Sequence, residues 1–234
     1  MKVIILAGGL GSRISEETAN KPKPMVLING KPILWHIMNI YATQGFNDFI
    51  VATGYKGEVI SEWVDSLKTD WKISTIDTGL ETQTGGRIKK CIELQSNERV
   101  LATYGDGVGN INMKKLLSFH ESHGKLATLS AVRPPARFGY LDTIDGQVIH
   151  FGEKNQSDSG WINGGYFVLE PQVSGYINSD IEPFEVGALP RLANARELMA
   201  FEHHEFWQPM DTLREKQDLE KLAQDGEPPW LIGI

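Results

Sequence analysis

Apolar residues follow two alternating patterns along the first part of the chain. Residues 3–7 form an uninterrupted apolar run that is rich in β-branched side chains and ends at glycine, which is typical of a strand buried on both faces. From Ile33 the apolar residues recur at helical spacing along one stripe, and Gly45 follows as a helix-ending glycine. The same alternation continues to residue 132. It predicts further strands at 49–53, 71–76, 99–104 and 127–132, and helices at 59–67, 87–95 and 113–120.

Strands that alternate with helices at this spacing predict an α/β fold. We expect a Rossmann-like, mostly parallel central sheet with helices on both faces. The second half differs, because two short apolar runs flank Asp145-Gly146, which suits the type I′ turn of a β-hairpin. The pattern then predicts a strand at 166–169 and helices after Pro171, at 185–196 and at 212–224. No linker or internal repeat interrupts residues 1–234, so we expect one domain with a mixed sheet.

The composition is that of a water-soluble globular protein. Hydrophobic residues make up 41% of the 234 positions and charged residues 23%. No apolar stretch approaches the roughly 18 to 20 residues of a membrane helix, and residues 3–7 are too short for a signal peptide. Cys91 is the single cysteine, so an intramolecular disulfide is excluded and a zinc cluster is disfavoured. We therefore expect a cytoplasmic protein without a membrane partner.

Charge narrows the classes of partner. The net charge of −7 argues against a nucleic-acid partner, which usually requires a basic surface. One short stretch nevertheless gathers four cations, Arg13, Lys21, Lys23 and Lys31, around only two acids, Glu16 and Glu17. This local excess of positive charge indicates a site for a phosphorylated ligand.

A glycine-rich loop follows the first strand directly, in the segment Gly8-Gly9-Leu10-Gly11-Ser12-Arg13. It lacks the third glycine of the dinucleotide-binding fingerprint, because Ile14 stands there, and it lacks the Gly-Lys-Ser/Thr ending of a Walker A loop. The glycines would let backbone N–H groups approach a polyphosphate, with Arg13 positioned to neutralise it. On the glycines alone, a tight turn with a surface arginine is an equally good interpretation.

Two lysines lie in the stiff segment Lys21-Pro22-Lys23-Pro24. A proline forces the residue before it toward an extended conformation, so we expect Lys21 and Lys23 to point to the same side. Taken alone, the segment fits a solvated surface loop better. Its position just after the glycine-rich loop makes a role in phosphate binding more attractive.

Two aspartates are candidate metal ligands. Asp106 follows a buried strand between two glycines, and Asp211 precedes a predicted helix. Mg²⁺ in phosphate sites is commonly held by one or two carboxylates together with phosphate oxygens and water. The alternatives are a turn aspartate at Asp106 and a helix N-cap at Asp211, and the spacing does not show that the two residues meet. Nearby, we expect His203-His204 to be a solvated strand end, and Trp207 to lie at a ligand site, an interface or the core.

These stretches together resemble the sugar-1-phosphate nucleotidyltransferases. LAGGLGSR followed by KPKPM is close to the G-x-G-[ST]-R…K-P signature of that family. Within the family, the chain is similar to the glucose-1-phosphate cytidylyltransferases over nearly its whole length, through SEET, KPKPMV, GKPILWHIM, GYKG, DTG…TGGR, TYGDGV, RFG, INGGYFVL and FWQPMDTLR. Two departures stand out. Asn155 replaces the proline of a Glu-Lys-Pro motif, and residues 66–71 are shorter than the corresponding segment of the cytidylyltransferases.

The resemblance implies the nucleotide-diphospho-sugar transferase fold and a reaction. A cytidylyl group would pass from CTP to a sugar 1-phosphate, such as glucose 1-phosphate, giving a CDP-sugar for polysaccharide biosynthesis and pyrophosphate, with Mg²⁺ as cofactor. It implies that Arg13 grips the departing phosphates and that Lys23 contacts the reacting α-phosphate. The implied nucleotide-binding residues are Leu6, Ala7, Gly8, Gly9, Gly11, Ser12, Gly85, Gly86, Arg87 and Asp106.

The resemblance also implies a sugar-phosphate side of the site and a metal pair. The implied sugar-phosphate residues are Glu153, Lys154, Asn163, Gly164 and Gly165, and Asp106 and Asp211 would share Mg²⁺. A homo-oligomer is compatible with the resemblance but not required by it. Two alternatives stay open: the same reaction with another nucleotide or another phosphorylated acceptor, and a nucleotide-binding regulatory module without turnover.

Overall fold

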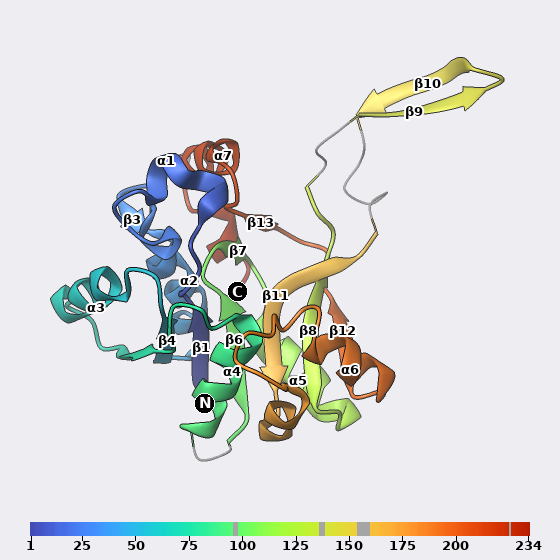
Figure 1. The fold of residues 1–234 in the computed structure, drawn as a ribbon. Helices are drawn as coiled ribbons and strands as arrows, with labels where there is room; N and C mark the ends of the chain where they lie inside the picture. Colours follow the sequence, from blue (N-terminus) through green and yellow to red (C-terminus); the bar gives the residue numbers. More distant parts are fainter. Residues whose placement is uncertain (96–97, 136–138, 154–159, 225) are drawn as a thin grey trace.

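A seven-stranded sheet forms the centre of the computed structural model, which describes residues 1–95, 98–135, 139–153, 160–224 and 226–234 (Figure 1). The strand order is β12-β8-β11-β6-β1-β4-β5. In chain order the strands are β1 (Lys2–Leu6), β4 (Asp48–Thr53), β5 (Lys72–Asp77), β6 (Val100–Tyr104), β8 (Ala127–Val132), β11 (Ile162–Leu169) and β12 (Leu198–Glu202).

Parallel pairing dominates this sheet. β1 pairs parallel with both β4 and β6, β4 pairs parallel with β5, and β12 pairs parallel with β8. Only β11 breaks the pattern, because it runs antiparallel between β6 and β8. This arrangement confirms the predicted mixed, mostly parallel sheet. The chain leaves β1 toward β4 and later returns to its other side at β6, so the switch point that favours a ligand crevice lies at the carboxyl ends of β1 and β6.

Helices cover both faces of the sheet, as predicted. Alternate residues of β1 enter different cores: Val3 and Ile5 pack on one face, and Ile4 and Leu6 pack on the other. The first face is covered by α2 (Ile33–Ala42), α3 (Gly57–Ser66), α5 (Met113–His123) and α7 (Leu213–Gln224). The opposite face is covered by α4 (Thr84–Glu93) and α6 (Ala188–Asn194). Burial on both sides explains why the strands are continuous apolar runs.

The predicted hairpin is confirmed as β9 (Gly139–Ile144) and β10 (Gln147–Glu153), which pair antiparallel. Asp145 and Gly146 have φ of 49° and 83°, and a type I′ turn requires positive φ at both of its central residues. In Figure 1 this ribbon stands apart from the main sheet.

Several short elements were not predicted: β7 and β13 because their partners lie far apart in the chain, and β2 and β3 because each has only two residues. β7 (Gly107–Gly109) pairs antiparallel with β13 (Trp207–Pro209), and β2 (Leu27–Ile28) pairs with β3 (Lys31–Pro32). The segment after Pro171 is a 3-10 helix (Pro171–Tyr176) rather than an α-helix. The helix expected at 185–196 runs only from Ala188 to Asn194, since Gly187 before it has a non-helical conformation (φ −107°, ψ −86°) and Arg196 after it has a left-handed φ of 59°.

The expectation for His203-His204 is half wrong. His204 is exposed, but His203 is buried, because its backbone N–H continues the pairing with β8 and its ring nitrogen Nε2 lies 3.2 Å from the carbonyl oxygen of Phe206. Burial lowers the pKa of the His203 ring.

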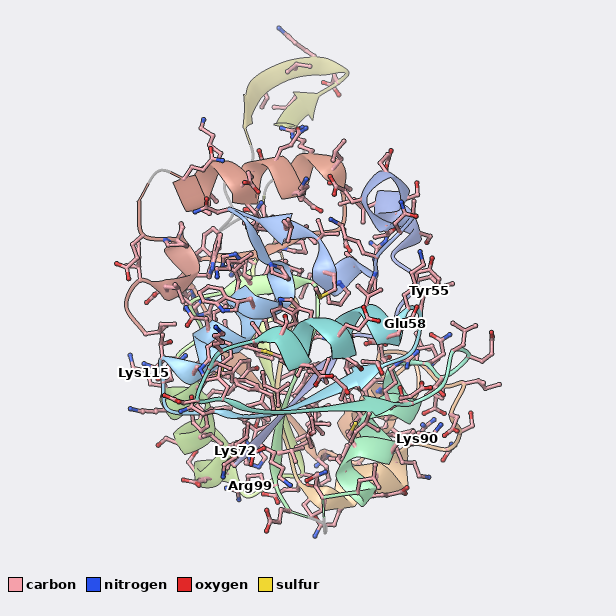
Figure 2. All side chains as sticks on the ribbon, turned by 90° about the vertical axis from the view of Figure 1, so that its left-hand side faces the viewer. Tyr55, Glu58, Lys72, Lys90, Arg99 and Lys115 are labelled. Carbon is pink, nitrogen blue, oxygen red and sulfur yellow. The ribbon has the colours of Figure 1, made fainter. Side chains whose placement is uncertain are left out.

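Lys72 and Asp77 place charged side chains at the two ends of β5, an edge strand of the sheet, and Figure 2 labels Lys72. Such charges discourage pairing of the exposed strand edge with another chain. In the described part of the chain, none of the helices has the length and apolar character to cross a membrane.

Candidate active site

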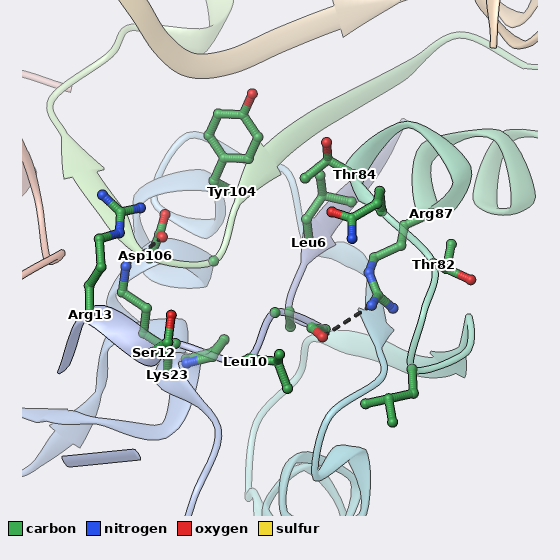
Figure 3. A pocket seen from close by; sticks show the side chains of 18 of the residues that line it. Leu6, Leu10, Ser12, Arg13, Lys23, Thr82, Thr84, Arg87, Tyr104 and Asp106 are labelled. Atoms are coloured by element: carbon green, nitrogen blue, oxygen red, sulfur yellow. Dashed lines mark hydrogen bonds and ion pairs between the residues drawn. The ribbon is translucent and has the colours of Figure 1, made fainter. Parts of the chain in front are cut away.

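A cavity of about 490 Å³ opens at the carboxyl ends of β1 and β6, where the switch point predicts it. The glycine-rich loop, Lys23 and the start of α4 form its wall. The lining residues are Leu6, Ala7, Gly8, Gly9, Leu10, Gly11, Ser12, Arg13, Lys23, Pro24, Leu80, Glu81, Thr82, Gln83, Thr84, Arg87, Tyr104, Gly105 and Asp106. Figure 3 shows Arg13, Lys23 and Asp106 on one side of the cavity and Thr82, Thr84 and Arg87 on the other.

The glycine-rich loop needs glycine for two different reasons. Gly11 has φ of +64°, a left-handed conformation that costs little only for glycine, and it leads into a 3-10 helix (Ser12–Ile14) anchored by buried Ile14. Gly8 is packed so closely against the guanidinium of Arg87 that a Cβ atom would overlap it. The loop backbone is thus held at the cavity wall, where its N–H groups can meet a ligand.

Arg87 lines the cavity and also fixes the glycine-rich loop. Its guanidinium is buried and donates hydrogen bonds to the carbonyl oxygens of Thr53 (2.7 Å) and Gly8 (3.0 Å, dashed in Figure 3) and to the Thr78 hydroxyl. Burial lowers the pKa of Arg87, and the nearby Asp77 carboxylate opposes that shift. Arg87 therefore links the carboxyl ends of three neighbouring strands, β1, β4 and β5.

Gly85 and Gly86, predicted to lie beside the base, do not line the cavity. A Cβ on Gly85 would lie 2.5 Å from the carbonyl oxygen of Glu182, and one on Gly86 would meet the backbone of Asp180. These two glycines let the start of α4 pack against residues 180–184. Their predicted place beside the base stays a prediction.

Lys23 stands between the two candidate metal ligands. Its Nζ atom lies 2.7 Å from Asp106 Oδ2 and 2.6 Å from Asp211 Oδ1, and Arg13 Nη1 lies 2.7 Å from Asp211 Oδ2. Burial on its own would lower the pKa of Lys23, but the two carboxylates outweigh it, so the net shift is upward. Four residues from distant parts of the chain therefore form one ion-pair chain at the cavity.

Asp211 reaches this position through the β7–β13 pair. The strands on either side bring Gly107 opposite Pro209, and the backbone N–H of Met210 donates a hydrogen bond to the carbonyl oxygen of Asp106 at 2.7 Å. Asp211 is not the N-cap that the alternative interpretation proposed. Thr212 caps α7 instead, because its hydroxyl accepts from the N–H of Glu215 (3.2 Å) and the Glu215 carboxylate accepts from the N–H of Thr212 (2.9 Å).

The two lysines of the proline segment diverge, which corrects the expectation that they share a side. Lys21 pairs with Glu17 at 3.9 Å, whereas Lys23 begins a 3-10 helix (Lys23–Met25) and is 7% exposed. The 3-10 turn ends the alternation of an extended chain. Of the two lysines, Lys23 is the one at the cavity.

The predicted sugar-side residues form a loop beside Tyr104. The Asn163 amide donates to the Tyr104 hydroxyl (3.1 Å), Gly165 has φ of +79° under the Tyr104 ring, and Trp207 Nε1 donates to the carbonyl oxygen of Gly164 (2.8 Å). Trp207 therefore lies beside the loop on the predicted sugar side of the site. Asn163, Gly164 and Gly165 adjoin the cavity through Tyr104 without lining it.

The other two predicted sugar-phosphate residues are Glu153 and Lys154. Glu153 is the last residue of β10, and Lys154 lies outside the described residues.

Nearly the whole described chain matches one family. A family model described as nucleotidyl transferase matches residues 2–208. The chain belongs to the nucleotidyl transferase family. It is 49% identical to glucose-1-phosphate cytidylyltransferase of Salmonella typhimurium, with 98% of each chain covered, and 41% identical to a probable glucose-1-phosphate cytidylyltransferase of Bacillus subtilis, with 99% of this chain and all of that one covered. A structure of HddC from Yersinia pseudotuberculosis complexed with GMP-PN superposes with a TM-score of 0.72 at 25% identity, covering 94% of this chain and 98% of that one.

Membership of the nucleotidyl transferase family confirms the predicted family and fold. The alignment with the Salmonella protein spans 253 positions, more than the 234 residues of this chain, so that protein carries residues without a counterpart here. The connection between α3 and β5 is residues 67–71, the region in which a shorter segment was predicted.

Two features of the site were not predicted from the sequence: the part of the cavity wall formed by residues 80–84, and the hydrogen bonds of the Tyr104 hydroxyl. The Tyr104 hydroxyl donates to Glu185, whose other carboxylate oxygen accepts from the Thr84 hydroxyl at 2.8 Å. Residues 80–84 follow β5 as the glycine-rich loop follows β1, so both segments lie at the carboxyl ends of parallel strands. That position could have predicted residues 80–84 as part of the site. No local pattern marks Glu185 as a partner of Tyr104.

Proposed function

We propose that this chain transfers a cytidylyl group from CTP to a sugar 1-phosphate, with glucose 1-phosphate as the expected acceptor. The observation that carries this is the ion-pair chain Arg13–Asp211–Lys23–Asp106 at a cavity walled by a glycine-rich loop. The identity of the nucleotide and the acceptor follows from the 49% and 41% identical relatives, whose names give glucose 1-phosphate and cytidylyl transfer.

In this proposal the triphosphate lies along the side of the cavity that carries the cations. Backbone N–H groups of residues 8–11 would contact phosphate oxygens, and Arg13, whose side chain is 71% exposed, would reach the two phosphates that leave as pyrophosphate. The nucleoside would extend toward the opposite wall, where Thr82, Thr84 and Arg87 lie. Residues 80–84 would then select the base.

Lys23 would act on the reacting phosphate. A sugar phosphate dianion is already nucleophilic at neutral pH, so no general base is needed for its in-line attack on the α-phosphorus. The difficulty is repulsion, since two like unit charges 4 Å apart repel by about 4 kcal/mol at an effective dielectric near 20. Lys23 would reduce that repulsion, in a reaction class where positioning and electrostatics supply most of the catalysis.

The residues present fit a divalent cation. Asp106 and Asp211 already hold one cationic group, the ammonium of Lys23, between an oxygen of each. In the described residues there is no group of three or more acidic, His or Cys side chains that could hold a metal, so the remaining ligands would be phosphate oxygens and water, as is usual for Mg²⁺. When bound, Mg²⁺ would supply positive charge to the phosphate oxygens.

On the sugar side, the loop of Asn163, Gly164 and Gly165 would receive the acceptor, and Trp207 would hold that loop in place. The product would be a CDP-sugar, used for surface polysaccharide. The proposed location is the cytoplasm, because the single cysteine, Cys91, leaves the chain without an intramolecular disulfide.

Pyrophosphate release tests the proposal. The chain is incubated with Mg²⁺, each of the four nucleoside triphosphates and a panel of sugar 1-phosphates. We expect release with CTP and glucose 1-phosphate. Release with another nucleotide or another acceptor would keep the reaction class and change the substrates. Absence of release with every pair, in a protein that binds CTP, would support a regulatory binding module instead.

A further inference from the structure

The Lys23 ammonium occupies the place between the two carboxylates where a divalent cation would have to sit. Its Nζ atom makes contacts of 2.7 and 2.6 Å with one oxygen of Asp106 and one of Asp211. Mg²⁺ binds oxygen ligands at about 2.0–2.1 Å, so the same two oxygens could hold it only after Lys23 has moved away. A lysine and a metal cannot both stand at this point.

Charge balance makes the lysine the stronger occupant when no nucleotide is bound. Asp106 and Asp211 carry two negative charges, and Lys23 and Arg13 already supply two positive charges through direct contacts. Lys23 is also 7% exposed, so water screens its charge poorly. A bare divalent cation would have to break both contacts of Lys23 and leave that ammonium buried without an anionic partner.

A triphosphate changes this balance. It brings about four negative charges, which can partner Lys23 and the metal together. Lys23 and Asp106 both line the cavity in which we place the phosphates. Since the lysine side chain turns about four flexible carbon–carbon bonds, its ammonium can leave the carboxylates for a phosphate without a change of fold.

We infer that Lys23 guards the metal position, so that the divalent cation enters together with the nucleotide and not before it. This inference rests on the proposed function for the identity of the nucleotide, but not for the competition between Lys23 and the cation. It gives Lys23 a second role beside its contact with the reacting phosphate. The same move that admits the metal would turn the ammonium toward the phosphates.

The experiment measures Mn²⁺ binding without nucleotide, by electron paramagnetic resonance. It compares the wild-type chain with Lys23→Met and with the matched control Lys21→Met, which removes a neighbouring lysine that pairs only weakly with Glu17, at 3.9 Å. We expect Lys23→Met to bind Mn²⁺ about 10-fold or more tightly than wild type, within the range usual for coupling between two binding events. Lys21→Met should match wild type. Equal or weaker Mn²⁺ binding by a folded Lys23→Met would overturn the inference.

A second arm uses only the wild-type chain, so that it stands even if the Lys23 variant fails to fold. Crystals are soaked in Mn²⁺ with and without CTP, and anomalous scattering locates the metal. We expect a metal at Asp106 and Asp211 only when CTP is present. A metal bound there without nucleotide would refute the guarding role. If the chain releases no pyrophosphate with any substrate pair, the proposed function fails, while the Mn²⁺ comparison without nucleotide still decides this inference.

Discussion

The backbone N–H of Met210 donates a hydrogen bond to the carbonyl oxygen of Asp106 at 2.7 Å. This one bond continues the β7–β13 pairing and sets Asp211 beside Asp106, although the two aspartates lie far apart in the sequence. The carboxylates then share the ammonium of Lys23. The site thus depends on a pair of three-residue strands.

Lys23→Ala should lower turnover by about 10²- to 10³-fold, because it removes a positive charge aimed at the reacting phosphate. Steady-state kinetics with CTP and glucose 1-phosphate measure the effect, and Lys21→Ala is the matched control. Near-normal kcat in a correctly folded Lys23→Ala protein would contradict the role assigned to Lys23.

Asp211→Asn should reduce turnover and raise the Mg²⁺ concentration needed for half-maximal rate, since it removes one charged oxygen donor but keeps the side-chain shape. A Mg²⁺ titration of initial rates measures both effects. Asp218→Asn, on the outer part of α7, is the control for loss of a carboxylate. An unchanged Mg²⁺ dependence in Asp211→Asn would remove Asp211 from the metal site.

Arg87→Met should lower the free energy of unfolding by about 2–4 kcal/mol, because Gly8, Thr53 and Thr78 would lose a buried charged donor. Urea denaturation measures this loss, and Arg214→Met, on the exposed side of α7, is the control. If both variants unfold at the same urea concentration, Arg87 does not hold the three strand ends together.

Trp207→Phe should raise KM for the sugar 1-phosphate several-fold and leave KM for CTP nearly unchanged. The ring is kept, but the hydrogen bond from Nε1 to the Gly164 carbonyl oxygen is lost, so the acceptor loop is less firmly held. Kinetics with each substrate varied in turn separate the two constants. Equal changes in both KM values would argue against a specific effect on the acceptor side.

Acid should destabilise the fold through His120. Burial lowers the pKa of this ring, and Arg99 lowers it further, while Glu170 and Glu121 oppose the shift. His123 and Thr128 also contact the ring. The native state thus takes up the proton at lower pH than the unfolded chain, so stability is full above pH 6.5 and falls as the pH drops below it. Urea denaturation between pH 7.5 and 5.5 should show this fall, with a smaller slope for His120→Gln. The same slope in both proteins would exclude His120 as a source.

Local patterns predicted most of the fold, because its main elements are long and buried. The runs predicted as strands correspond to β1, β4, β6 and β8, which are mostly apolar and buried, and the stripe that begins at Ile33 corresponds to α2. What local patterns could not supply was pairing between distant short segments. Gly107–Gly109 and Trp207–Pro209 carry no strand signal of their own, and each is a strand only because the other is present.

The site shows the same difference between features that adjacent residues predict and features that depend on distant residues. The glycine-rich loop, Arg13 and Lys23 were predicted from adjacent residues. The hydrogen bonds of Arg87 were not predicted, because its partners lie at the ends of three different strands. Two roles were open for Asp211, a metal ligand and a helix N-cap. Thr212 takes the N-cap position through its capping box with Glu215, and the metal role stays a proposal.

A crystal structure of the chain with CTP and Mn²⁺ tests most directly whether Arg13, Lys23, Asp106 and Asp211 surround one triphosphate. We expect the phosphates along residues 8–11, with Arg13 and Lys23 in contact with them and Mn²⁺ bound by both aspartates. A nucleotide bound elsewhere, or phosphates that touch none of these four side chains, would contradict the proposed site.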